Sequence, residues 1–174
     1  MEVIKAIAVA LLLLLLGDFV ATFAYHVPEH VFGKFHSIVH HSPQRSFVRY
    51  AIRHQKPIAL IDGFLGAFPY FLFIPWLWGI SNVGVTLGLG LAELHVIWRH
   101  QFSSSYKTPS IIQQICKCFC ITTPERHWRH HQNANLAYGD IFTFYGKPAQ
   151  VWLKNLRWLR KSVRRMGITR ASGR

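Results

Sequence analysis

The chain has 174 residues, a length that corresponds to one domain. Apolar residues make up 51% of it and charged residues only 16%, which excludes a disordered chain and disfavours an ordinary soluble domain. Lysine and arginine outnumber the acids 20 to 7, the formal net charge is +13, and three cysteines are too few for a disulfide framework.

The first predicted element is a membrane span over residues 6–25. Asp18 is the only charged residue in this stretch, and about twenty apolar residues suffice for a helix to cross a bilayer core. Two other interpretations remain open. Lys5 followed by a leucine run and small residues is typical of a secretory signal peptide. A buried helix of a soluble protein is disfavoured, because two more long apolar stretches would need burial in so short a chain.

The second apolar stretch, residues 57–98, is about twice as long as one span requires. A turn signal around Gly79 divides it, so we expect one span over residues 58–78 and another over residues 83–98. The latter is short and rich in glycine, which suits close packing of helices.

The basic residues predict the orientation of these spans. Residues 26–56 carry five lysines or arginines and residues 99–174 carry more, whereas only Lys5 precedes the first span. The positive-inside rule therefore places residues 26–56 and 99–146, together with the tail that follows, in the cytoplasm. We expect an all-α integral membrane protein, a single domain over residues 1–174, with about three transmembrane helices and a cytoplasmic His-rich helical cap.

Residues 149–165 are predicted to form an amphipathic basic helix. Apolar residues recur there at helical spacing while lysines and arginines occupy another face, a pattern that favours an anionic membrane surface as its partner. Nucleic acid is the competing partner for a chain of this charge. It is disfavoured, because membrane proteins gather cytoplasmic lysine and arginine in any case.

Histidine is the second compositional anomaly, since only His54 of the 11 histidines stands apart from a cluster. Histidines three or four residues apart share a helix face, so two rings can bind one ion, and neutral imidazole is the commonest metal ligand. We therefore predict ten metal ligands: His26, His30, His36, His40, His41, His95, His100, His127, His130 and His131.

Ten histidines exceed the four positions of a tetrahedral zinc site and match two octahedral ions better. Imidazole suits zinc, copper, iron and nickel alike, so the ligand type leaves the metal open. Cys116, Cys118 and Cys120 alternate along the chain and lack the C-x-x-C spacing of zinc knuckles, which favours reduced structural thiols.

Four further residues are expected to support the histidines without binding metal: Asp18, Glu93, Tyr138 and Asp140. An ionisable residue within an apolar span is costly and usually has a partner, as for Asp18 and Glu93. A carboxylate that accepts the second ring N–H of a bound histidine fixes the orientation of its ring, a role that we also assign to Asp140. Tyr138 is expected to donate a hydrogen bond near the same site.

The order of these motifs resembles that of the fatty acid hydroxylase / sterol desaturase superfamily of integral-membrane di-iron oxygenases. The most specific stretch, TTPERHWRHHQNANLAYGDIFTFYG, resembles the final histidine box of that family. Residues 18–30 resemble the first box, FHSIVHHSP resembles the second, and His100 resembles the isolated histidine after the membrane hairpin. The second box here reads H-x-x-x-H-H instead of H-x-x-H-H, Val27 stands where an arginine is common, and the family tends to have four spans.

The resemblance implies two iron ions, with zinc as the alternative, and no catalytic residue beyond the metal ligands. It also implies O2-dependent hydroxylation or desaturation of a C–H bond in a fatty acyl, sterol or carotenoid-type lipid. Electrons would come from a separate carrier of the cytochrome b5 or ferredoxin type, whose acidic surface the net charge would attract.

Two alternatives stay open beside the oxygenase. A zinc-dependent membrane hydrolase would use the same ligands, with Glu93 or Glu125 as the general base. A non-enzymatic metal-binding or transport protein is the other. It is disfavoured, because transporters bind ions near the bilayer midplane and the histidines here lie at the ends of the predicted spans.

Overall fold

The structure is a computed structural model that describes residues 1–33, 36, 39, 47–100 and 106–171. Apart from turns and one isolated bridge between Ile121 and Phe142, the secondary structure of these residues is helical, which confirms the predicted all-α class. In chain order the elements are α1 (Glu2–Val20), η1 (Ala21–His26), α2 (Val27–Phe32), α3 (Phe47–Arg53), α4 (Ile58–Phe71), α5 (Ile74–Trp78), α6 (Asn82–Arg99), α7 (Ser110–Cys118), α8 (Pro124–Gln132), η3 (Thr143–Tyr145) and α9 (Gly146–Ala171).

Among the described residues, two helical segments are long and apolar enough to cross a membrane. The first, Glu2–Phe32, joins α1, the π-helix η1 and α2 without a break, and the second, Ile58–Trp78, comprises α4 and α5. The third predicted span corresponds to α6, which does not reach the same apolarity because Glu93, His95 and Arg99 lie within it.

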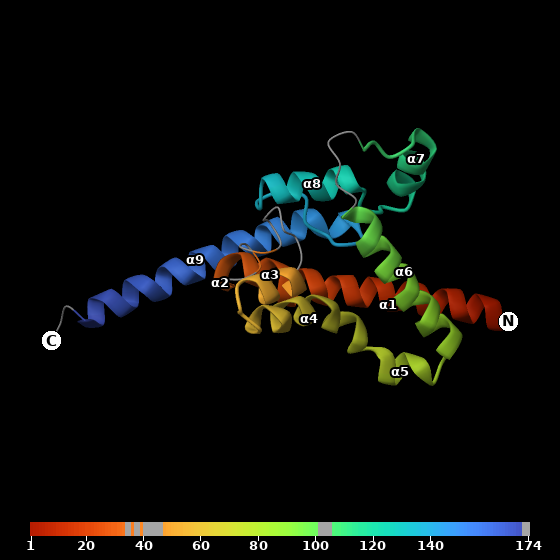
Figure 1. Ribbon diagram of the computed structural model, residues 1–174, viewed down its shortest axis with the longest axis horizontal. Helices are drawn as coiled ribbons and strands as arrows, with labels where there is room; N and C mark the ends of the chain where they lie inside the picture. The colour runs from red at the N-terminus through yellow and green to blue at the C-terminus, as the bar shows by residue number, and fades with distance from the viewer. Residues whose placement is uncertain (34–35, 37–38, 40–46, 101–105, 172–174) are drawn as a thin grey trace.

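Helix α6 packs closely against α1, and two of its glycines permit this approach (Figure 1). A Cβ atom at Gly84 would lie 2.6 Å from the Ala6 carbonyl oxygen, and one at Gly88 would lie 3.2 Å from the Ala10 Cα atom. Gly90 faces open space instead. The expected close packing through glycine is therefore confirmed at two of the three positions.

The prediction of a turn between the second and third apolar segments is confirmed. Helix α5 ends at Trp78, and α6 begins at Asn82 after Ser81, whose hydroxyl accepts a hydrogen bond from the Gly84 N–H group at 3.1 Å. Helix α4 contains Pro69 and ends two residues later. It packs against α1 and η1, so both α4 and α6 contact α1.

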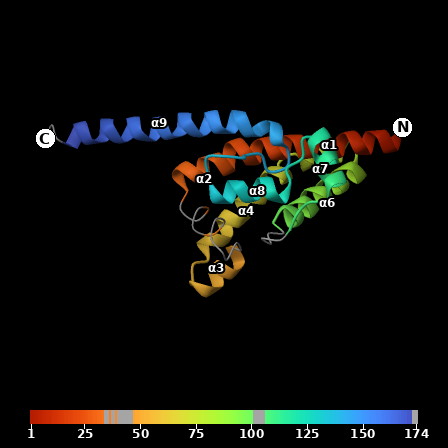
Figure 2. The ribbon, with the colours of Figure 1, turned by 90° about the horizontal axis from the view of Figure 1, so that it is seen from above.

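Helix α9 runs alongside the N-terminal helix and continues past the end of α2 (Figures 1 and 2). Ala149, Leu153 and Leu156 are buried in one cluster with Val27 and Val31, so the first half of α9 covers α2. Beyond Leu156, the apolar side chains of α9 that the structure describes are exposed: Trp158, Leu159, Val163 and Met166. The predicted tail helix, residues 149–165, lies within α9, and one of its faces is buried against protein.

Candidate metal centre

Helix α8 directs its three histidines to two different places. The Thr123 hydroxyl accepts from the Arg126 N–H group and caps the helix, and Pro124 occupies its first turn. At about 100° per residue, His127 and His131 lie roughly 40° apart, whereas His130 lies about 60° from His127 on the opposite side. One short helix can therefore serve two neighbouring sites.

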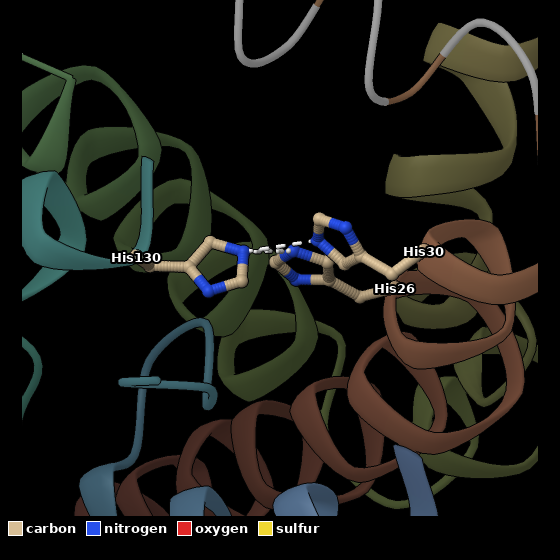
Figure 3. Close-up of side chains that lie close together, drawn as sticks. All are labelled: His26, His30 and His130. Carbon is tan, nitrogen blue, oxygen red and sulfur yellow. Dashed lines mark hydrogen bonds between the residues drawn. The ribbon is translucent and has the colours of Figure 1, made fainter. Parts of the chain in front are cut away.

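The first His group consists of His26 from η1, His30 from α2 and His130 from α8. The His130 Nε2 atom lies 2.9 Å from the His26 Nε2 atom and 3.1 Å from the His30 Nε2 atom. Figure 3 shows the three rings pointing toward one another from two sides of a gap. The group joins residues about a hundred positions apart in the chain.

The second His group consists of His100, which follows α6, with His127 and His131 of α8. The His127 Nε2 atom lies 3.2 Å from that of His100 and 3.1 Å from that of His131. The two groups are adjacent, because the rings of His127 and His130 are stacked with their centres 6.1 Å apart.

In three of these histidines the Nδ1 atom, which faces away from the other rings of the group, lies beside a hydrogen-bond acceptor. The His26 Nδ1 atom lies 3.0 Å from an Asp140 carboxylate oxygen, and the Nδ1 atoms of His130 and His100 lie 2.8 and 2.7 Å from backbone carbonyl oxygens. An acceptor at Nδ1 fixes the proton there and leaves the lone pair on Nε2. Facing lone pairs about 3 Å apart repel unless a cation lies between them, so the donor set fits metal ions.

Charge around the site favours neutral imidazoles beside an ionised carboxylate. Burial lowers the pKa of His127 well below its ordinary value, and the nearby Arg99 guanidinium adds to this effect. Burial alone would raise the pKa of Asp140, but Arg99 and His26 outweigh it and hold that pKa well below its usual range. Arg99 is buried, and its Nη1 atom lies 2.9 Å from the Asp140 carboxylate.

Asp18 supports this site through the backbone of residues 140–142. Its buried carboxylate accepts hydrogen bonds from the backbone N–H groups of Asp140, Ile141 and Phe142 at 3.0, 3.0 and 2.6 Å. The Thr22 hydroxyl donates a fourth at 3.1 Å. Asp18 therefore fixes the backbone that carries Asp140, which in turn orients His26.

Tyr138 also lies beside the first His group, where it acts through packing. Its ring centre is 4.6 Å from that of His130 and 5.4 Å from that of His26. Its hydroxyl donates to the Ala134 carbonyl oxygen at 2.7 Å, and the buried ring fills the space behind the histidines.

The remaining predicted ligands differ in their placement. The His36 ring centre lies 4.8 Å from those of both His26 and His30, so His36 adjoins the first group. His40 and His41 lie outside the described residues. His95 joins neither group, because it lies about 140° from His100 around α6 and its Nε2 atom is 2.9 Å from the Thr122 carbonyl oxygen.

A cavity of about 540 Å³ adjoins both His groups. Residues of η1, α4 and α6 form its walls, and His26, His100 and the Arg99–Asp140 pair contribute polar groups to its lining. Most of the remaining lining is apolar or aromatic, including Leu89 and Phe71. Its volume and largely apolar lining are typical of a small-molecule site.

Sequence reasoning missed Arg99. It was counted among the basic residues that flank a span, a role in which the side chain faces water, yet it is buried beside Asp140. The one available signal was its position next to His100, at the end of an apolar stretch that already contained an acid.

Apolar helices that end in two adjacent histidine groups define a histidine-box protein. A family model described as fatty acid hydroxylase matches residues 10–147, and the chain belongs to this family, which confirms the resemblance to the fatty acid hydroxylase / sterol desaturase superfamily. The match runs from α1 to the start of α9 and includes both His groups. No curated protein and no solved structure matches the chain.

Family membership implies a hydroxylase-type oxidoreductase and suggests that its substrate is a lipid. Together with the two apolar helical segments, it also suggests a membrane protein. The His groups are compatible with metal binding, as their ring nitrogens converge.

Proposed function

We propose that the chain is an O2-dependent lipid oxygenase with two iron ions, one at each His group. The convergence of the two groups beside one largely apolar cavity carries this proposal. When bound, such ions supply the activation of O2 for oxidation of an unactivated C–H bond, by hydroxylation or desaturation.

In this proposal the chain's own residues bind the lipid and orient the metal ligands. Apolar walls from α4 and α6 would hold the lipid chain and exclude water, with its reacting carbon beside His26 and His100. Asp140 keeps the His26 proton on Nδ1, so that Nε2 remains a ligand atom. The buried Arg99–Asp140 pair keeps that carboxylate ionised in apolar surroundings.

The membrane arrangement belongs to the same proposal. With α6 as a third span, both His groups lie on the side of the chain that carries most lysine and arginine, which is the cytoplasmic side by the positive-inside rule. A separate acidic electron carrier would dock on this basic side.

The test is expression in a membrane host, purification in detergent, and measurement of metal content and lipid products. The wild-type protein should hold about two metal ions per chain and add one oxygen to a lipid, or remove two hydrogens, only with O2 and a reductant. His130→Ala and His131→Ala should each abolish the product and lower the metal content, since each removes a ligand from a different group. His54→Ala is the matched control, because His54 lies against Tyr50 outside both groups.

Two results would contradict the proposal. Metal-replete protein that leaves a broad lipid panel unchanged under O2 and reductant is not an oxygenase. Lipid turnover that persists under strict anaerobiosis would indicate a zinc-dependent hydrolase instead.

A further inference from the structure

One carboxylate on α6, that of Glu93, lines the cavity. On α6 the lining residues include Leu89, Ala92, Glu93 and Val96, so Glu93 is the one acid in an otherwise apolar strip. Among the described residues, Glu93 makes no hydrogen bond and no ion pair. Glu93 is exposed, and among the described residues no histidine donates a hydrogen bond to it. Its predicted role behind a histidine stays a prediction, because His40 and His41 lie outside the described residues.

A lipid that fills the cavity would displace water from Glu93, and a carboxylate left there without a hydrogen-bond donor costs free energy. Two donors that line the cavity, Arg99 and His26, are engaged elsewhere. Arg99 pairs with Asp140, and the His26 Nδ1 atom faces the same carboxylate. A donor carried by the cavity's occupant would satisfy Glu93.

The position of Glu93 on α6 sets where that donor would lie. Glu93 and His100 are seven positions apart, which is nearly two full turns, so both lie on the same face of the helix about 10 Å apart along its axis. An occupant that reaches the His groups with one carbon can therefore present a polar group to Glu93 with another part of the same molecule.

We propose that Glu93 determines substrate specificity by accepting a hydrogen bond from a hydroxyl group of a neutral lipid. The proposal rests on the cavity being the lipid site of the proposed function. A free fatty acid would bind poorly, because its own carboxylate would be repelled by that of Glu93. The hydroxyl can belong to a long-chain alcohol or to a sterol, and the experiment separates these two sources.

The experiment measures binding to the purified full-length protein in nonionic detergent by competition with a fluorescent lipid, so it does not depend on turnover. Two matched pairs serve as probes: octadecan-1-ol against octadecane, and cholesterol against cholest-5-ene. A hydrogen bond to a charged group corresponds to about a tenfold preference or more for the hydroxylated member. The pair that shows the preference identifies the source of the hydroxyl.

Three variants locate the effect at residue 93. Glu93→Leu should remove the preference by weakening only the hydroxylated probe, whereas Glu93→Gln, which keeps an acceptor oxygen and the side-chain shape, should retain part of it. Leu94→Gln is the matched control, since Leu94 is exposed on α6 and is absent from the cavity lining. Metal content should be unchanged in all three, because none alters a His group.

Several outcomes would overturn the proposal: equal binding within both pairs by the wild-type protein, binding of neither pair, or an undiminished preference in Glu93→Leu. Failure of the proposed function is distinguishable from these. A protein that prefers the hydroxylated probe but never oxidises a lipid refutes the oxygenase and keeps the role of Glu93. A protein that oxidises a lipid but shows no preference for a hydroxyl refutes the role of Glu93 and keeps the oxygenase.

Discussion

Asp18 is the residue on which the geometry behind the histidines depends most. Its single carboxylate satisfies three successive backbone N–H groups, at Asp140, Ile141 and Phe142, in a place where water does not reach them. A buried donor left without an acceptor costs about 1–3 kcal/mol. An amide at this position would offer one acceptor oxygen and turn an NH2 group toward donors.

We therefore expect Asp18→Asn to lower the free energy of unfolding by on the order of 3 kcal/mol. It should also reduce metal occupancy, because the displaced backbone carries Asp140 away from His26. Thr22→Val, which removes only one donor to Asp18, should cost about 1 kcal/mol and spare the metal. Thermal unfolding in detergent and elemental analysis measure both effects, and a fully stable, metal-replete Asp18→Asn protein would contradict this account.

The residue types predicted much of which side chains belong to the site, but they could not predict which of these groups contact one another. Clustered histidines pointed to metal, and an acid inside an apolar stretch pointed to a partner. Which partner it has depends on contacts across more than a hundred residues, so the sequence could not show that Asp18 binds backbone while Asp140 binds His26. Arg99 was missed for the same reason, since its burial is a property of the fold.

The N-terminal helix aligns side chains that a regular α-helix would spread apart. Asp18, Thr22, His26 and His30 follow one another at intervals of four, and each such step in an α-helix adds about 40° of rotation. The wider turn of the π-helix η1 reduces this drift just where the site begins. Spacing alone predicted a shared face for His26 and His30, but nothing in the sequence signalled the π-helix.

Packing between α1 and α6 depends on glycine at particular positions. Gly84→Ala should destabilise the protein by about 1–3 kcal/mol, since the added Cβ atom would lie 2.6 Å from the Ala6 carbonyl oxygen and 2.8 Å from the Val9 Cβ atom. Gly90→Ala is the matched control and should be neutral or stabilise by up to about 1 kcal/mol, because nothing lies within 4 Å of its Cβ atom. Equal unfolding temperatures for the two variants would show that α1 and α6 do not need this close approach.

At the scale of the whole molecule, the last helix covers the end of the N-terminal helical segment, which carries His26 and His30. Helix α9 covers α2 with Leu153 and Leu156, and Arg160 donates a hydrogen bond to the Val31 carbonyl oxygen. Past Arg160 the described side chains of α9 are mostly exposed. The amphipathic pattern predicted this helix correctly but assigned its apolar face to a membrane surface, whereas part of that face contacts α2. Periodicity shows that a face is apolar and leaves open what covers it.

Two truncated chains should show which half of α9 the metal centre and the fold require. A chain that ends at Arg160 should keep its metal content and stability. A chain that ends at Pro148 should lose both, since it uncovers Val27 and Val31 and forfeits about 2 kcal/mol for each buried leucine. Metal content and yield of folded protein from membranes measure the difference. Metal-replete protein from the shorter chain would show that α9 is dispensable for the centre.

The bonds between Asp18 and residues 140–142 also impose an order on biosynthesis. Their ends are separated by 122 to 124 positions, so α1 must leave the ribosome and wait, with an uncompensated carboxylate, until nearly the entire chain has been translated. The complete first His group, with its orienting carboxylate, can therefore form only after His130 and Asp140 have been translated. A nascent chain stalled before Asp140 would hold the histidine pair His26 and His30 without the carboxylate that orients it.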